Sequence, residues 1–447
     1  MAKHILYAGS SIVDISPKPG IPLAGYPHFP RYNTGVHDPL YASCLTLDDG
    51  VACLAIVCAD LVGISKALTR RVRRGVESQT GIPGANIMLA CSHTHSGPWT
   101  AMEFDSDSAD GLTKQDAGFV AELEEKLIQL VVSSARNPFE AKIGIEKGIC
   151  GKEQGIGGNR RDPKGPVDPE VWTIGVQDLA GKWRACLVKY ALHPTVIHED
   201  STVVTADYPA YIRSYLAKTH PGMIMLFAQG VSGDQSSRYF RKGQSFGEAE
   251  RIGSTIGKTA ADVLARMPLS ATVPLAAQSG IAEIQLRKLP PCAELENMIA
   301  QAKRNYEALK FAKAPYLDIQ NANLALLGAE DLLALHTVQE HKPTCEMLND
   351  EPHAEVQVFG VGDTRMVGLP GEIFVEFGLQ IQKASPLPKT FVIELANGYL
   401  PGYVCTAEAY ARGGYETGAS MLTVQAGDAL VATSLRLLNE LSASSRH

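Results

Sequence analysis

Three short apolar segments of the chain each end in a turn that carries a histidine or a glutamate, which limits the folds open to it. The residues that follow these segments are His93, His193 and Glu372. Short apolar runs bounded by turn residues are typical of buried strands. Side chains that follow strand ends can converge above a sheet, where α/β proteins place their chemistry. The sequence therefore predicts sheets whose ends share one polar site.

The rest of the chain predicts strands and helices in alternation. Turn signals that separate paired apolar runs indicate hairpins at Asp49-Gly50, Ala180-Gly181 and Gly362-Asp363. A first strand is expected over residues 3–8. Helical spacing and capping signals predict helices over 65–78, from Thr113 to about Ser134, and over 209–219, 247–266, 373–384 and 424–441.

These elements indicate an α/β fold in which mixed β-sheets at the core are flanked by helices. We expect a single large domain over residues 1–447, with a helical insert at about 290–340. The insert carries no obvious catalytic residue, so it is interpreted as a cover or a wall of the site. The length of the chain is ample for a sizeable core.

Composition excludes several classes of protein. Hydrophobic residues make up 45% and charged residues 20% of the 447 residues, as in ordinary globular proteins. The net charge of -7 argues against a nucleic-acid partner. No segment approaches the roughly 18 consecutive apolar residues of a transmembrane helix. Nine cysteines without a Cys-x-x-Cys pair, and no apolar leader, indicate reduced thiols and a cytoplasmic location.

The stretch Cys91–Pro98 contains two histidines that are two positions apart, His93 and His95. On a strand these side chains would project to the same face. Gly97 and Pro98 then end the strand, so both imidazoles are expected at its end. Two converging imidazoles can begin a zinc site, although a pair of structural histidines is the alternative.

The two further polar residues at strand ends strengthen the metal interpretation. Taken singly, His193 is compatible with a buried polar residue, and Glu372 with a carboxylate favoured at a helix N-terminus. Two imidazoles and one carboxylate together are a catalytic zinc set that leaves a position open for water. Together the three residues favour a catalytic metal site.

Several motifs resemble, in order, those of the neutral/alkaline, non-lysosomal ceramidase family, over its catalytic domain. The resemblance extends over nearly the whole chain. The motifs are Asp14-Ile15-Ser16-Pro17, Leu23-Ala24-Gly25-Tyr26, Ala59-Asp60-Leu61, Ser92–Pro98, Asn159-Arg160, Val167–Glu170, Ala191–Thr195, Gly233–Ser236, Leu369–Glu372, Tyr403–Thr406 and Tyr415–Ser420.

The resemblance implies a zinc ion and its ligands. Carried over position by position, the ligands are His93, His193, Glu372 and Tyr403. Zn²⁺ is therefore the expected cofactor. For Tyr403 the sequence alone favours a half-buried tyrosine with a wet hydroxyl, and only the resemblance gives it a ligand role.

The resemblance also implies four catalytic residues. Ser236 matches the serine that the family treats as its nucleophile, and His95 would lie beside the metal as a proton-transfer or oxyanion group. Arg160 and Tyr415 fall on positions that line the site. The nucleophile is either Ser236 or a zinc-activated water, and we favour the water because its pKa falls near neutrality.

The expected function is hydrolysis of a linear amide bond by a ceramidase-like, zinc-dependent N-acyl amidohydrolase of lipid or sphingolipid metabolism. Arg238 closes a Ser-Ser-Arg segment where the family has Ser-Pro-Asn, and Trp99 replaces a small residue. A charge and a bulky ring there favour a substrate smaller or more polar than ceramide. The family's C-terminal immunoglobulin-like domain is expected to be absent.

Three alternatives stay open at this point. An esterase or lactonase could use the same metal site. A metal-independent serine hydrolase could pair Ser236 with His95. A non-catalytic binding protein with the same fold is disfavoured, because all four metal positions hold suitable residues. The expected partner is a small-molecule amide or ester, and the oligomeric state is open.

Overall fold

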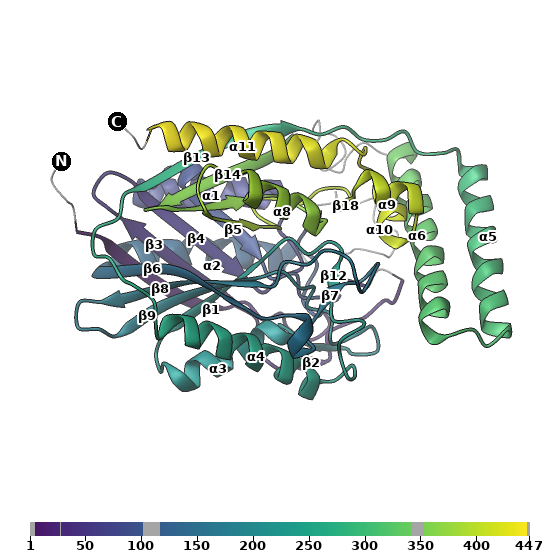
Figure 1. Cartoon of the computed structure of the whole chain (residues 1–447), viewed down its shortest axis with the longest axis horizontal. Helices are drawn as coiled ribbons and strands as arrows, with labels where there is room; N and C mark the ends of the chain where they lie inside the picture. Colours follow the sequence, from purple (N-terminus) through teal and green to yellow (C-terminus); the bar gives the residue numbers. More distant parts are fainter. Residues whose placement is uncertain (1–4, 27, 102–116, 342–352, 445–447) are drawn as a thin grey trace.

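An eight-stranded mixed sheet forms the larger layer of β-structure in a computed structural model that describes residues 5–26, 28–101, 117–341 and 353–444 (Figure 1). Its strand order is β11-β9-β8-β6-β1-β3-β4-β5, with parallel pairs β4–β5 and β9–β11. The strands are β1 (Tyr7–Asp14), β3 (Tyr41–Asp48), β4 (Cys53–Ala59), β5 (Ile87–Cys91), β6 (Phe139–Ile149), β8 (Glu170–Asp178), β9 (Trp183–Tyr190) and β11 (Ile224–Gln229).

A second sheet of four strands has the order β13-β14-β15-β17, in which β15 and β17 are parallel. Isolated bridges join this part of the chain to both edges of the larger sheet. Ala396, after β17, bridges to Ala90 in β5, and Ile393 at the end of β17 bridges to Gly230, just after β11. The strands are β13 (Leu275–Glu283), β14 (His353–Val361), β15 (Thr364–Gly368) and β17 (Lys389–Ile393).

Helices cover the outer faces of the two sheets. Helix α2 contacts β1 and β3, α4 contacts β6 and β8, and α11 contacts β13 and β14. No helix within the described residues is long and apolar enough to cross a membrane. The helices are α1 (Lys66–Thr80), α2 (Ala117–Arg136), α3 (Tyr208–Thr219), α4 (Phe246–Leu264), α8 (Val375–Ala384) and α11 (Ala426–Ser444).

Short elements lie in the loops that connect these strands and helices. They matter because several carry residues of the predicted site. These elements are β2 (Gly35–Val36), η1 (Gly84–Asn86), η2 (Lys152–Gln154), β7 (Gly158–Asn159), β10 (Val203–Val204), β12 (Gln235–Ser236), β16 (Glu372–Ile373), β18 (Tyr403–Val404), α9 (Ala407–Arg412) and α10 (Tyr415–Gly418).

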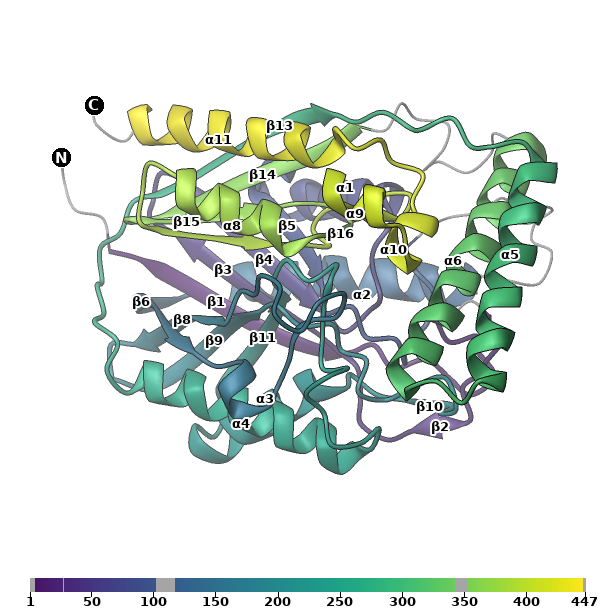
Figure 2. The same ribbon diagram turned by 45° about the vertical axis from the view of Figure 1, so that its right-hand side comes forward.

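Two antiparallel helices, α5 (Cys292–Phe311) and α6 (Tyr316–His341), form a hairpin at the side of the molecule (Figure 2). The predicted insert is thus helical. Only Leu295 is buried within α5, whereas α6 also contacts α10. The side chain of His28 contacts Asp331 of α6 at 2.8 Å. Helix α6 therefore lies between the outer helix and the loops near the sheet ends.

The core lies on both faces of the large sheet. Apolar side chains of β4, β5 and β11 pack against those of β14, β15 and β17, with Met88, Leu226, Phe359 and Phe391 fully or almost fully buried. The rings of Trp172 and Phe391 stack with centroids 5.0 Å apart. Complete burial of side chains of this kind stabilises the fold by about 1.5–3 kcal/mol each. This packing fixes the relative position of the two sheets.

The predicted mixed α/β class and three hairpins are confirmed, with differences at particular elements. The first strand was expected over residues 3–8, but β1 runs over Tyr7–Asp14 because it pairs along its whole length with β3. The predicted helix start at Thr113 lies outside the described residues. Strand β6 is not predicted by its pattern, which includes Gly144 and Gly148. A Cβ at these positions would lie 2.4 Å from Pro268 O and 2.6 Å from Thr259 Cγ2 respectively.

Candidate active site

The predicted metal residues meet at the carboxyl ends of parallel strands from both sheets. His93 follows β5, His193 follows β9, and Glu372 in β16 follows β15. Ligand sites of α/β folds occur at such strand ends, because the loops there are free to diverge. All three side chains are almost completely buried.

The donor atoms of these residues lie close together. His93 Nε2 and His193 Nε2 lie 3.2 and 3.1 Å from the same oxygen, Glu372 Oε2. His95 Nε2 lies 3.2 Å from His93 Nε2. Tetrahedral zinc with bonds of about 2.0–2.1 Å separates its ligand atoms by about 3.3 Å. The three histidines form a group that could hold a metal ion, and the Glu372 carboxylate fits the same position.

Backbone carbonyls orient two of the imidazoles. Nδ1 of His93 lies 2.7 Å from the carbonyl oxygen of Val62, and Nδ1 of His193 lies 2.7 Å from that of Ser232. A carbonyl oxygen only accepts, so each Nδ1 carries the proton and donates. Each Nε2 then presents a lone pair to the cluster, as in metal sites whose ligands are held from behind.

The electrostatics of the cluster favour a positive charge at its centre. Burial lowers the pKa of His193 to about 4 and that of His95 well below its ordinary value, so both imidazoles are neutral at pH 7. Burial alone would raise the pKa of Glu372, but His93 and His193 lower it well below its usual range. Burial alone would lower the pKa of His93, and Glu372 overcomes this and raises it. A buried carboxylate thus needs a proton or a cation beside it.

The two histidines of the His-x-His motif converge for a reason other than strand alternation. Strand β5 ends at Cys91, and His93 lies in the loop with a positive φ of 68°. The prediction that both histidines extend from a strand is therefore wrong, because the backbone turns between Cys91 and His95. His95 was expected beside the metal, yet its Nε2 faces the same point as the other two imidazoles.

The N-terminal Leu-Ala-Gly-Tyr segment holds His95 in place. A Cβ at Gly25 would lie 2.3 Å from Cγ of His95, and the φ of Gly25 is +94°, so a larger residue would displace the imidazole. The ring of Tyr26 meets that of His95 edge-on, with centroids 5.0 Å apart. Arg31 Nη2 donates to the carbonyl oxygen of His95 at 2.6 Å.

Tyr403 lies directly beside Glu372, because the two residues are register partners in the parallel pair β16–β18. Its ring is 6.0 Å from that of Tyr415, and the guanidinium carbon of Arg160 lies 5.4 Å from its centroid. The structure thus brings Tyr403, Tyr415 and Arg160 together next to the histidine cluster. The ligand role of Tyr403 remains a prediction.

Two residues that the sequence does not single out support the cluster. The hydroxyl of Tyr399 donates to Glu372 Oε1. Glu394 accepts from Ser232 Oγ at 2.6 Å and from the Ile373 backbone N–H at 2.9 Å, so it connects the loops of His193 and Glu372. Both residues follow β17, and a polar residue at a strand end is the signal that could have revealed Glu394.

We expect Tyr399→Phe to lower metal affinity about 10- to 100-fold, because supporting hydrogen bonds to ligands typically have effects of this size. Tyr190→Phe is the matched control, since its buried hydroxyl donates to Cys150 O at 2.8 Å, outside the cluster. Metal competition titrations on both variants measure the difference. Equal affinities would contradict the supporting role of Tyr399.

Arg160 and its neighbour Arg161 share one carboxylate. Arg160 Nε donates to Glu416 Oε1 at 2.8 Å, and Arg161 Nη1 donates to Glu416 Oε2 at 2.5 Å. Nη2 of Arg160 is buried and has no hydrogen-bond partner among the described residues. Arg160 therefore keeps a free donor close to Tyr403, in the place expected for a group that stabilises developing negative charge.

Ser236 lies in β12, which pairs with β7 and so lies beside the segment that carries Arg160. Its side chain is buried, and its Oγ accepts a hydrogen bond from the Arg238 backbone N–H at 3.2 Å. No hydrogen bond joins Ser236 to His95, whose Nε2 faces His93 instead. An activated serine needs a base within hydrogen-bond reach. The serine–histidine pair of the metal-independent alternative is therefore not formed.

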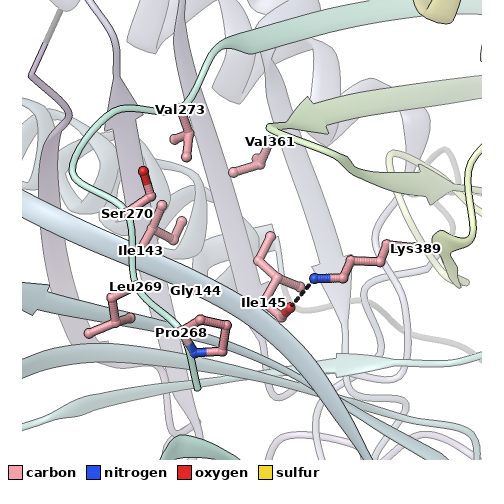
Figure 3. Close-up of a pocket in the computed structure, with 9 residues that line it drawn as sticks. All are labelled: Ile143, Gly144, Ile145, Pro268, Leu269, Ser270, Val273, Val361 and Lys389. Atoms are coloured by element: carbon pink, nitrogen blue, oxygen red, sulfur yellow. Dashed lines mark hydrogen bonds between the residues drawn. The ribbon is translucent and has the colours of Figure 1, made fainter. Parts of the chain in front are cut away.

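An apolar recess elsewhere on the molecule shares no residue with this cluster (Figure 3). It lies between β6 and the segment that leads to β13, where Lys389 Nζ donates to Ile145 O at 3.5 Å. The residues that line it are Ile143, Gly144, Ile145, Pro268, Leu269, Ser270, Val273, Val361 and Lys389.

Comparison with known proteins identifies similar structures and one similar sequence. The structure of neutral ceramidase from Pseudomonas aeruginosa superposes with a TM-score of 0.74, covering 99% of this chain and 75% of that chain at 16% identity. A ceramidase complexed with C2 gives the same TM-score at 17% identity, covering 99% and 76%. The chain has the neutral ceramidase fold. The fold that the resemblance of the motifs implies is thereby confirmed.

The sequence comparison agrees with the structural one. The chain is 21% identical to neutral ceramidase of Pseudomonas aeruginosa, over 89% of its own length and 66% of that relative. It thus spans about two thirds of the relative and is its distant homologue. No family model matches the chain.

Proposed function

We propose that the chain is a zinc-dependent hydrolase that cleaves a linear amide bond, as a ceramidase-like N-acyl amidohydrolase. The observation that carries this proposal is the meeting of His93, His193 and Glu372, with His95 beside them, at atom separations that suit one tetrahedral ion. The homology to neutral ceramidase supports the amide as the bond cleaved.

A zinc ion in this cluster would polarise the amide carbonyl and lower the pKa of a water molecule towards neutrality. The residues of the chain hold the substrate and manage its charge and protons. Arg160 offers its free Nη2 to the developing oxyanion. Burial, together with Asp331 and Glu372, raises the pKa of Tyr415 well above its ordinary value, so its hydroxyl stays a donor.

Departure of the amine requires a proton, since an amide anion is a poor leaving group. His95 and Tyr415 are the candidates for this transfer. Nδ1 of His95 lies against Gly25, so the transfer would use its Nε2, which faces the cluster. In this proposal Ser236 orients the substrate or the attacking water and forms no covalent bond.

We propose that the protein acts in the cytoplasm and that its substrate is smaller or more polar than ceramide. Trp99 is half-buried, and its Nε1 is buried without a partner among the described residues. An indole N–H in need of an acceptor suits a polar substrate better than two long hydrocarbon chains.

The test combines metal analysis of the purified protein with hydrolysis of N-acyl amines, ceramide and matched esters. The proposal expects bound zinc, loss of amide hydrolysis after chelation and recovery when zinc is restored. Activity that survives complete zinc removal would contradict it. Faster cleavage of the esters would instead favour an esterase, and efficient turnover of ceramide would refute the smaller substrate.

The serine variants separate the two nucleophiles. We expect Ser236→Ala to lower kcat by about 10- to 100-fold, the effect of losing one orienting hydrogen bond. A covalent nucleophile would instead cost about a millionfold. Ser237→Ala is the control, because this neighbouring hydroxyl is buried without a hydrogen-bond partner among the described residues. Single-turnover assays measure the loss.

A further inference from the structure

Arg238 places a positive charge beside Ser236 without an acidic partner of its own. The residue is half-buried and lies two positions after the end of β12, and its backbone N–H donates to Ser236 Oγ at 3.2 Å. Among the described ion pairs and hydrogen bonds, none joins the Arg238 guanidinium to a carboxylate. A partly buried cation without a counter-ion is costly unless a ligand supplies one.

The carboxylates near Arg238 are already engaged by other groups. Both oxygens of Glu416 accept from Arg160 and Arg161. Asp234 accepts from the side chain of Asn159 and from the backbone N–H of Val375. Both carboxylates are therefore already engaged, and neither forms an ion pair with Arg238.

The electrostatic neighbours of Arg238 lead to the same conclusion. Burial lowers the pKa of its guanidinium, and the charges of Arg160 and Arg241 act in the same direction, while Glu416 opposes them. The guanidinium nevertheless remains charged at neutral pH. The Glu416 carboxylate that acts on Arg238 is thus one that Arg160 and Arg161 already engage.

We propose that Arg238 binds an anionic group of the substrate, so that the preferred substrates are N-acyl amides that carry a carboxylate or a phosphate near the scissile bond. A guanidinium matches both groups through paired N–H donors. This inference rests on the proposed amide hydrolysis and specifies its substrate class. It also gives a physical role to the arginine that replaces the family's asparagine.

The experiment compares amides that differ in charge. N-lauroylethanolamine is neutral, N-lauroylglycine carries a carboxylate and N-lauroylethanolamine phosphate carries a phosphate, while glutaric acid monoethanolamide places the acid on the acyl side. Arg238→Asn removes the charge and Arg238→Lys retains it. Lys258→Asn on α4 is the control. The exposed side chain of Lys258 pairs with Asp262, four residues further along the same helix.

We expect Arg238→Asn to lower kcat/KM for at least one anionic amide about 10- to 100-fold, as for loss of a charged hydrogen bond. The neutral amide should change by no more than about threefold, Arg238→Lys should recover part of the loss, and Lys258→Asn should match the wild type. The acid that responds identifies the group bound. An equal effect on neutral and anionic amides would overturn the inference.

Binding measurements separate this inference from the proposed function. Calorimetric titration of N-lauroylglycine and N-lauroylethanolamine needs no turnover. If no amide is hydrolysed but the acid binds more tightly in an Arg238-dependent manner, the hydrolase proposal fails and the anion site stands. If the amides are hydrolysed without such a preference, the anion site fails alone.

Discussion

Replacing His93 by alanine is expected to abolish metal binding and to reduce kcat/KM by about a thousandfold or more, because the ion supplies several kcal/mol of transition-state stabilisation. The imidazole contacts both Glu372 and His95, so its loss removes a central donor from the group that would hold the ion. Metal content by mass spectrometry and hydrolysis rates, measured on the same preparation, test this expectation.

The control for this variant is His37→Ala. His37 is a partly exposed histidine that stacks on Phe246, with ring centroids 3.5 Å apart. Its loss should leave metal content and rate unchanged. If His93→Ala kept its metal and its rate, the histidine cluster would not be the catalytic centre.

Replacing Glu416 by glutamine is expected to destabilise the protein by about 3–5 kcal/mol, the usual cost of removing one partner from a buried ion pair. Glu416 is almost completely buried and neutralises both Arg160 and Arg161. Its pKa is lowered because the attraction of the two guanidiniums outweighs burial, which alone would raise it. Urea unfolding followed by fluorescence measures the shift.

Glu408→Gln is the matched control for this second expectation. Glu408 pairs with Arg412 one helical turn away, and its side chain is 75% exposed. Exposed pairs of this kind contribute about 0–1 kcal/mol, so the unfolding midpoint should hardly move. Similar midpoints for the two variants would show that the Arg160 pair is not a structural requirement.

The sequence predicts local pairing better than long-range pairing. The hairpin at Asp49-Gly50 is visible because its turn and its apolar strands are adjacent in the chain. Strand β6 cannot be recognised in this way, because its glycines and charged residues are typical of a loop. Its glycines are explained only by the close approach of Pro268 and Thr259, which are distant in the chain. The register of β1 is set by β3 and not by its own composition.

The candidate site follows the same rule. The motifs and strand ends indicate His93, His193 and Glu372, which the structure brings together. Tyr399 could not be identified in this way, because its contact with Glu372 depends on the path of the chain after β17. The approach of His95 to the centre likewise depends on the backbone turn at His93 and on Gly25.

The pairs that join Glu372 to two histidines have a mechanical consequence. His93 and His193 belong to loops of the large sheet, whereas Glu372 extends from the small sheet, 179 positions after His193. An ion held by all three would cross-link the two layers of the protein. The free energy of binding the ion would then add to the free energy of unfolding of the protein. Removal of the ion by a chelator would leave the two sheets without this cross-link.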